Sequence, residues 1–225
     1  MKLISNWTRV AIAMAASFLI ASNASAVNVL VNPSFEDEGF EGPETFLPDA
    51  GTGWTAFDGM IRIQGQPPIG PTGAFDGDVV LKAFGFGGAF QDILGLGPND
   101  IVTGTVMVMN DSLDPMAGGQ VAALNLEWLK DGVPIPNVVS FGSTIDASAP
   151  LDTWIEIGVI GAPVPSDVGA NGVRITLITG AFAEGGPGGA PRFDSASLEI
   201  VPIPAAVWLF GSAIGLLGAV RRRIA

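Results

Sequence analysis

The segment 121–130, with the sequence V-A-A-L-N-L-E-W-L-K, alternates apolar and polar side chains with a period of two. Leu124, Leu126 and Trp128 fall on one face of an extended chain, and the polar residues between them fall on the other. This period is typical of a β-strand buried on one side only. The segment therefore predicts a strand whose apolar face, including Trp128, points into a core.

The same kind of pattern recurs through most of residues 27–200. In 153–160, T-W-I-E-I-G-V-I, the apolar set is Ile155, Ile157 and Val159, which leaves Trp154 on the side of Glu156. Further short apolar or alternating runs, separated by Gly, Pro, Asn and Asp, predict strands at 27–31, 54–57, 60–64, 78–84, 89–94, 101–109, 173–179 and 192–200.

No run of ten or more residues in this region keeps a helical period free of Gly and Pro. Many short strands with turn residues between them favour an all-β fold, an antiparallel β-sandwich, and about eight to ten strands fit a jelly roll. We expect irregular loops at 36–49, which is acidic, and at 185–191, which is rich in glycine.

Composition excludes several classes of protein. The 225 residues include no Cys and no His, so thiol nucleophiles, disulfides, Ser-His-Asp triads and the usual zinc sites are absent. All 22 acidic residues but only five basic residues lie between 36 and 199, which gives this region a net charge of −17. Such a domain repels polyanions, so we expect no nucleic-acid partner.

Residues 1–26 predict a secretory signal peptide. Lys2 and Arg9 precede the apolar run V-A-I-A-M-A-A-S-F-L-I-A at 10–21, and Ala24-Ser25-Ala26 forms a cleavage site of small residues. The apolar run is too short to cross a bilayer core of roughly 30 Å. A short N-terminal membrane anchor is the alternative interpretation.

The C-terminal segment 201–225 has a different character. Residues 201–220 carry no charge and are followed by three arginines. Twenty helical residues span about 30 Å, the thickness of one bilayer core, and the arginines predict a cytoplasmic end. The segment therefore predicts a transmembrane helix rather than a buried C-terminal helix.

The tail begins with V-P-I-P-A-A-V-W-L-F-G-S at 201–212, and the apolar stretch ends at an Arg cluster. In this order of motifs it resembles the PEP-CTERM sorting signal of Gram-negative bacteria that produce exopolysaccharide. The resemblance implies that an exosortase, a membrane-embedded cysteine protease, removes the tail after a transient insertion into the inner membrane. Ile203 stands where many members have an acidic residue. The positions that carry the resemblance are Val201, Pro202, Ile203, Pro204, Arg221, Arg222 and Arg223.

A second resemblance concerns residues 27–200. N-V-L-V-N-P-S-F-E at 28–36 opens this region, R-F-D-S-A-S-L-E-I at 192–200 closes it, and G-D-V-V-L-K-A-F lies between them. This order is similar to galactose-binding-like jelly rolls, which include many carbohydrate-binding modules. In those modules, acids near the two chain ends commonly hold a structural Ca²⁺, so the resemblance implies a metal site at Glu36 and Asp194.

Asp78, in the D-G-D turn at 76–78, is a candidate third carboxylate for this site, since Ca²⁺ takes six to eight oxygen ligands. The alternative is that all three acids are solvated turn residues. Trp54 and Trp154 are candidate stacking platforms for sugars, whose C–H surfaces pack on aromatic rings. Both could equally be residues at the edge of the core.

The sequence predicts three domains: a signal peptide, an exported sandwich at 27–200 and a sorting tail at 201–225. The expected function is that of a non-enzymatic protein of the cell surface or biofilm matrix, cut by signal peptidase and exosortase and acting in adhesion or matrix structure. A specific carbohydrate-binding module is the alternative. An enzyme acting on glycosides through two carboxylates is a distant third, because such pairs arise by chance among 22 acids.

Overall fold

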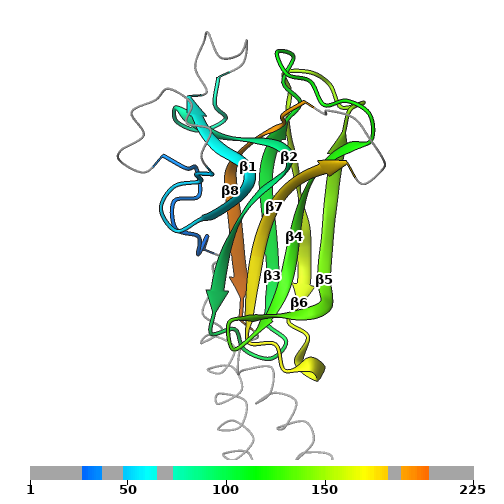
Figure 1. Ribbon diagram of the computed structural model, residues 1–225. Helices are drawn as coiled ribbons and strands as arrows, with labels where there is room; N and C mark the ends of the chain where they lie inside the picture. Colours follow the sequence, from blue (N-terminus) through cyan, green and yellow to red (C-terminus); the bar gives the residue numbers. More distant parts are fainter. Residues whose placement is uncertain (1–26, 37–47, 65–72, 182–188, 203–225) are drawn as a thin grey trace, which may run out of the picture. The chain divides into compact units, whose positions relative to one another are not determined.

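A computed structural model of the chain describes residues 27–36, 48–64, 73–181 and 189–202. Residues Val27–Ile200 form one compact unit. The described residues form eight strands and one short 3-10 helix (Figure 1): β1 (Thr55–Gln64), β2 (Val79–Leu94), β3 (Ile101–Met109), β4 (Gln120–Lys130), β5 (Val133–Asp146), β6 (Trp154–Pro163), η1 (Ser166–Val168), β7 (Gly172–Ala181) and β8 (Arg192–Val201).

The strands are joined in the order β5-β4-β7-β2-β8-β3-β6, and β1 pairs with β2. The ladders β1–β2, β2–β7, β2–β8, β3–β6, β4–β5 and β4–β7 are antiparallel. The two ends of the order approach each other where the Gly158 N–H on β6 donates to Ser143 Oγ on β5 at 3.0 Å. The sheet thus curls into a nearly closed antiparallel sandwich, which confirms the predicted all-β class.

Strand β2 connects the two layers of the sandwich, one with β5, β4 and β7 and the other with β8, β3 and β6. Its first part pairs with β8 at Leu81 and Lys82, and its last part, from Gly88 to Leu94, pairs with β7. The predicted strands 78–84 and 89–94 are therefore one long strand. Between them Gly85 has φ +58°, a conformation that glycine adopts without strain. The predicted strands 54–57 and 60–64 are likewise one strand, β1, with a register shift between Phe57 and Gly59.

Strand β5 is absent from the sequence-based prediction. Its sequence V-P-I-P-N-V-V-S-F-G-S-T-I-D contains Pro134 and Pro136, which weaken the strand signal. β5 stands at the end of the strand order, where a missing N–H can point away from the ladder. Asp131 and Gly132 both have positive φ, and these two residues form the tight turn that joins β4 to β5.

The predicted strand at 27–31 forms only a single bridge, between Asn28 and Glu199. Side chains replace the missing ladder. Asn28 Nδ2 donates to the Ala196 carbonyl at 3.0 Å, and Asn28 Oδ1 accepts from the Leu198 N–H at 3.0 Å. The prediction of a strand here is wrong, because amide side chains attach this segment to the sheet instead of a continuous backbone ladder.

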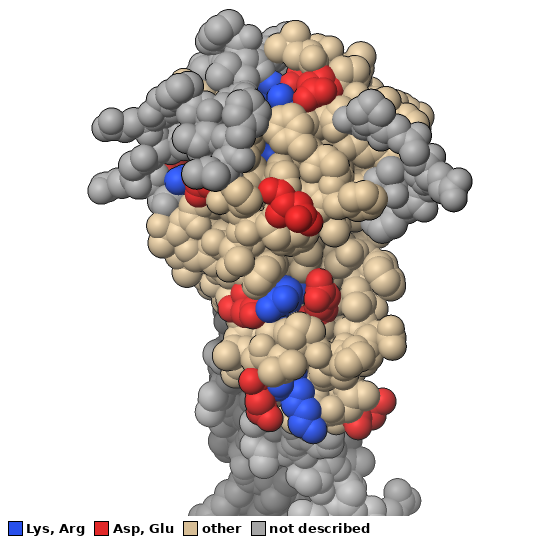
Figure 2. All heavy atoms as spheres, viewed as in Figure 1, with Lys and Arg blue, Asp and Glu red and all other residues tan. Residues whose placement is uncertain are grey.

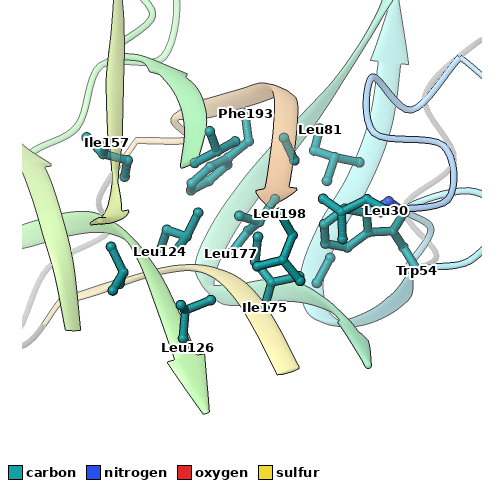
Figure 3. Packing of buried hydrophobic residues seen from close by; sticks show 14 of the residues in the cluster. Leu30, Trp54, Leu81, Leu124, Leu126, Ile157, Ile175, Leu177, Phe193 and Leu198 are labelled. Carbon is teal, nitrogen blue, oxygen red and sulfur yellow. The ribbon is translucent and has the colours of Figure 1, made fainter. Parts of the chain in front are cut away.

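The main hydrophobic core lies between the two layers and draws on every strand (Figure 3). Leu124 and Leu126 on β4 and Ile157 on β6 point into it, as the alternation predicted. Trp128 is 2% exposed and donates from Nε1 to Ser140 Oγ at 3.2 Å, so its predicted place in the core is confirmed.

Candidate functional site

The outward face of strands β1, β2, β7, β4 and β5 carries a mixed set of polar and aromatic side chains, and we call it the sheet face. Directly paired residues on neighbouring antiparallel strands project to the same side. The ladder registers place two adjacent rows on this face: Thr55, Phe90, Thr176, Asn125 and Phe141 in the first, and Asp92, Arg174, Glu127 and Val139 in the second.

Arg174 occupies the middle of the second row and is fixed from two directions. Its guanidinium donates from Nε and Nη2 to the two carboxylate oxygens of Asp92, at 2.7 and 2.9 Å. The guanidinium carbon also lies 3.7 Å from the centroid of the Phe90 ring. The hydrogen bonds to Asp92 raise the pKa of Arg174 above its ordinary value, against the effect of partial burial. A planar cation that is both paired and stacked is held in one orientation.

Glu127 lies on the other side of Arg174, on β4. Its Oε1 accepts a hydrogen bond from Thr176 Oγ1 at 2.8 Å, which orients the carboxylate on the surface. In Figure 2, basic atoms lie between two acidic groups near the middle of the visible surface, and most of the remaining surface is uncharged. The trio of Asp92, Arg174 and Glu127 has a formal charge of −1, so the sheet face presents oriented hydrogen-bonding groups without excess positive charge.

Four phenylalanines lie on the same face, all on the side of this polar row where the first row runs. Phe141 is 76% exposed and Phe86 is 63% exposed, while Phe57 and Phe90 are half-buried with their ring centroids 6.3 Å apart. Phe57 and Phe86 lie close to the sheet because glycines lie beneath their rings. A Cβ at Gly88 would collide with the Phe57 ring, and one at Gly180 would lie 2.8 Å from Phe86 Cδ1.

The sequence analysis did not identify the sheet face. Its only signal was the outward assignment of Asn125 and Glu127, which matches their half-buried positions in the structure. The partners come from segments up to 82 residues apart, as with Asp92 and Arg174. Only the strand register could bring them together.

Trp54, predicted as a candidate platform, belongs to the main core. It is 7% exposed, and its ring centroid lies 5.3 Å from that of Phe35 (Figure 3 shows Trp54 beside Leu30). Its Nε1 donates to the Asn32 carbonyl at 3.0 Å. A ring enclosed in this way cannot stack on a ligand from solvent, so the alternative interpretation, a core residue, replaces the platform.

Trp154 is the first residue of β6. It lies on the outside of the layer that contains β8, β3 and β6, and it is half-buried. It packs against a small second cluster formed by Ile61, Ile63 and Val80. Its ring meets the Phe75 ring edge-on at 6.1 Å, and Nε1 donates to the Gly73 carbonyl at 3.3 Å. Part of the ring remains accessible, and its role as a platform stays a prediction.

Glu36 and Asp194 come from opposite ends of the compact unit and meet at one turn, residues 75–79. Glu36 Oε1 accepts from the N–H groups of Asp78 and Val79, at 2.7 and 2.6 Å. Asp194 Oδ2 accepts from the N–H groups of Phe75 and Asp76, at 2.7 and 3.0 Å. The turn passes close to Glu36 at Gly77, which has φ +66° and whose Cβ would collide with that carboxylate.

Asp194 is fully buried, and burial raises the pKa of its carboxyl to about 7. The backbone hydrogen bonds from Asp76, Ser195 and Phe75 oppose this shift, and the negative charge of Glu36 adds to it. Two acids so arranged disfavour the ionised form of Asp194. A cation at this place would relieve both effects.

Asp78 does not supply the expected third carboxylate. It contributes its backbone N–H to Glu36, and among the described residues no three acidic side chains lie close enough together to hold an ion. The three-carboxylate arrangement is therefore wrong for this part of the chain. Ca²⁺ also accepts backbone carbonyl oxygens and water, so the hypothesis of a site at Glu36 and Asp194 stays a prediction.

A buried ion pair joins the start of β8 to the loop after β3. Arg192 Nη2 donates to Asp111 Oδ2, and the two side chains are 1% and 0% exposed. Asp111 Oδ1 also accepts from the Leu113 N–H at 3.1 Å. Lys82, which pairs with Arg192 in the β2–β8 ladder, forms an ion pair of its own with Asp114 at 3.3 Å. These contacts attach the loop after β3 to the sheet.

The predicted signal peptide and most of the sorting tail lie outside the described residues. Of the proline motif, Val201 ends β8 and Pro202 follows it, and both are exposed. Ile203, Pro204 and the three terminal arginines are not described. Within the described ranges, no helix has the length and hydrophobicity needed to cross a membrane.

No protein-family model matches this sequence, and no curated protein matches it. Solved structures do match. A cyclase from Fischerella sp. in its apo form is 16% identical, with 80% of this chain and 99% of that chain covered and a TM-score of 0.53. The Stig cyclase Fisc from Fischerella sp. TAU, in complex with (3Z)-3-(1-methyl-2-pyrrolidinylidene)-3H-indole, is 18% identical, with 80% and 100% covered and a TM-score of 0.52.

Carbohydrate-binding modules are also among the structural neighbours. The module TmCBM61 in complex with β-1,4-galactotriose is 15% identical, with 76% of this chain and 97% of that chain covered and a TM-score of 0.49. At these sequence identities the matches indicate the fold alone. The cyclase matches, with TM-scores above 0.5, support the β-sandwich architecture over most of the chain.

Proposed function

We propose that this protein binds polysaccharide through the sheet face and acts, without catalysis, in adhesion or in the structure of an extracellular matrix. The observation that carries the proposal is that one surface combines exposed phenylalanine rings with a row of hydrogen-bonding groups, Asp92, Arg174 and Glu127, whose orientation is fixed by their neighbours. Sugars present apolar C–H surfaces and hydroxyl groups side by side, and such a ligand needs both kinds of contact.

The polar row is prepared for binding before a ligand arrives. Asp92 and the Phe90 ring fix Arg174, and Thr176 orients Glu127. Groups that are already ordered lose less conformational entropy on binding, which favours affinity. Phe86 and Phe141 are the rings most open to solvent on this face, so they are the best candidates for stacking on a sugar.

Binding by a purified 27–202 fragment to a polysaccharide array tests the proposal. This fragment contains the compact unit and its whole described core, and a cooperative thermal transition checks that it is folded. Phe141→Ala and Phe86→Ala should each weaken binding about fivefold or more, as loss of a stacking contact of about 1–3 kcal/mol predicts for aromatic platforms. Ile160→Ala, which removes an equally exposed apolar side chain from β6, should have no effect.

The same array separates the two candidate surfaces. If Trp154→Ala abolishes binding while Phe141→Ala leaves it unchanged, the ligand occupies the outside of the layer that contains β6, and the sheet face is not the site.

An enzyme would release new reducing ends from a bound polysaccharide. We expect none, because a pair of carboxylates at suitable spacing arises by chance among 22 acids and does not by itself indicate catalysis.

We further propose that the protein is exported and sorted by an exosortase through residues 201–225. The support is the order of proline motif, uncharged span and arginine cluster in the sequence. Intact-mass analysis of the cell-surface or secreted protein should show loss of residues 1–26 and cleavage near Val201. A mature form that retains Ile224 and Ala225 would identify a permanently anchored protein instead.

A structural Ca²⁺ is the third part of the proposal. Glu36 and Asp194 would hold it, and the ion would supply positive charge beside the buried carboxyl of Asp194 and the neighbouring exposed carboxylate of Glu36. The donor set fits a hard cation, because every side-chain donor at this place is a carboxylate oxygen. Carbonyl oxygens and water would complete the coordination.

A further inference from the structure

We infer that the ligand of the sheet face is a neutral polysaccharide held along several consecutive sugar residues, and that the face discriminates against acidic polysaccharides. The inference rests on the proposed function and adds the chemical class of the ligand. It follows from the charges on the face and from the spacing of its aromatic rings.

Basic groups are scarce in the compact unit, and most of them are compensated by acids. Of the five basic residues at 27–200, four form ion pairs with acids: Arg62 with Asp49, Lys82 with Asp114, Arg174 with Asp92, and Arg192 with Asp111. The fifth, Lys130, ends β4 at the edge of the sheet face. Recognition of carboxylate, sulfate or phosphate groups needs Arg or Lys that is available to the anion.

Arg174 does not meet this need. Its guanidinium group already donates hydrogen bonds to both carboxylate oxygens of Asp92, and Glu127 lies on the adjoining strand. A uronic acid placed on this row would meet two carboxylates and one cation already paired. A neutral sugar hydroxyl has no such conflict, because it can donate to the carboxylate oxygens of Asp92 and Glu127.

The rings are too far apart for a single sugar. Phe86 on β2 and Phe141 on β5, the two exposed rings, lie on strands that have β7 and β4 between them. Three strand spacings amount to about 14 Å, which exceeds the width of one pyranose ring. A ligand that contacts both rings therefore lies across the strands as a chain of several units.

The sheet face is also unlike an interface between proteins. Phe86 and Phe141 are on different strands, and Asn125 and Thr176 lie between Phe141 and Phe90 in the first row. The apolar area is thus divided by polar groups instead of forming one continuous patch. A polymer that alternates hydroxyl and C–H surfaces matches this division.

The first test measures binding of the 27–202 fragment to matched pairs of polymers that share a backbone and differ in charge. Suitable pairs are hydroxyethyl cellulose with carboxymethyl cellulose, and β-1,4-galactan with polygalacturonate. We expect binding to at least one neutral polymer, at least tenfold weaker binding to acidic polymers at low ionic strength, and no competition by monosaccharides. Oligosaccharides of increasing length should compete with increasing affinity until the row is filled.

The outcomes separate the two proposals. No binding to any polymer, or binding that Phe141→Ala does not weaken, refutes the proposed function and this inference together. Binding that Phe141→Ala weakens, but that acidic polymers share equally or a monosaccharide blocks, overturns this inference alone. A dimer in sedimentation that Phe141→Ala abolishes would assign the face to contacts between copies of this chain and would refute both.

The second test changes the charge without changing the shape. Glu127→Gln keeps an oxygen that can accept from Thr176 Oγ1 and removes one negative charge from the row. Relative to neutral polymer, binding to acidic polymer should rise about fivefold at low ionic strength and lose this gain at 1 M salt. Glu156→Gln, an exposed acid on β6, should leave the ratio unchanged. An unchanged ratio in Glu127→Gln contradicts the charge argument.

Discussion

Removing one partner of the buried Asp111–Arg192 pair should lower the stability of the domain sharply. In Asp111→Asn the shape is kept, but the guanidinium of Arg192, 1% exposed, loses the carboxylate that neutralises it. Breaking a buried ion pair costs about 3–5 kcal/mol, because a charge is left uncompensated in a medium of low polarity. At roughly 2–4 °C per kcal/mol for a domain of this size, Tm should fall by about 6–20 °C.

A double-mutant cycle makes the prediction specific to the pair. Arg192→Met alone should also destabilise the domain, whereas Asp111→Leu combined with Arg192→Met should recover much of the loss, since apolar replacement of both partners is often close to neutral. Thermal and urea unfolding of the 27–202 fragment at pH 7 would supply the values. If Asp111→Asn lowers Tm by less than about 2 °C, or if the two single effects simply add, the pair does not stabilise the fold in the way that its burial indicates.

Three further predictions concern the turn at 75–79 and the sheet face. Saturating Ca²⁺ should raise Tm by about 5–11 °C, an effect that Glu36→Gln and Asp194→Asn each remove and that Glu156→Gln retains; equal melting curves in Ca²⁺ and chelator would exclude the site. In chelator, stability should fall as pH rises from about 4 to 7, with a slope of up to 1.4 kcal/mol per pH unit, because the folded state keeps the proton of Asp194 up to its raised pKa of about 7 while the unfolded state loses it near 4. Asp194→Asn should flatten that slope, and a slope that survives the substitution would assign it to another group. Gly88→Val should cost about 1–3 kcal/mol, because its side chain displaces the Phe57 ring, and unchanged urea unfolding would contradict that packing.

The sequence predicted strands well wherever local pattern and burial agree. β3 was predicted with its observed bounds, and β4, β6, β7 and β8 differ from their predictions by one to three residues at an end. The alternation in β4 assigned Leu124, Leu126 and Trp128 to the core correctly. It succeeded because a strand buried on one face must place its apolar residues with a period of two.

The failures share a different cause. β5 contains two prolines that a strand tolerates only when it has a neighbour on one side, and the number of neighbours is a property of the whole sheet. The two halves of β2 are one strand because β8 pairs with its first part and β7 with its last. Trp54 follows the loop sequence G-T-G, and only packing against Phe35 shows that it is enclosed.

The sequence indicated one of the two candidate sites, and only the structure showed the other. The resemblance at the two chain ends was enough to single out Glu36 and Asp194, and the structure brings both to one turn. The sheet face had no such signal, since Asp92, Arg174 and Glu127 are separated by dozens of residues and each is unremarkable in its own segment.

What the sequence determined by itself is therefore local and compositional: the strand pattern, the inward faces, the acidic charge and the character of the two ends. These depend on side-chain periodicity and on sums over residues, which are present in the chain before it folds. What the tertiary structure decided is which outward-facing side chains become neighbours. That depends on strand order and register. A slip of one residue on β7 would move Arg174 to the opposite side of the sheet and separate it from Asp92 and Glu127.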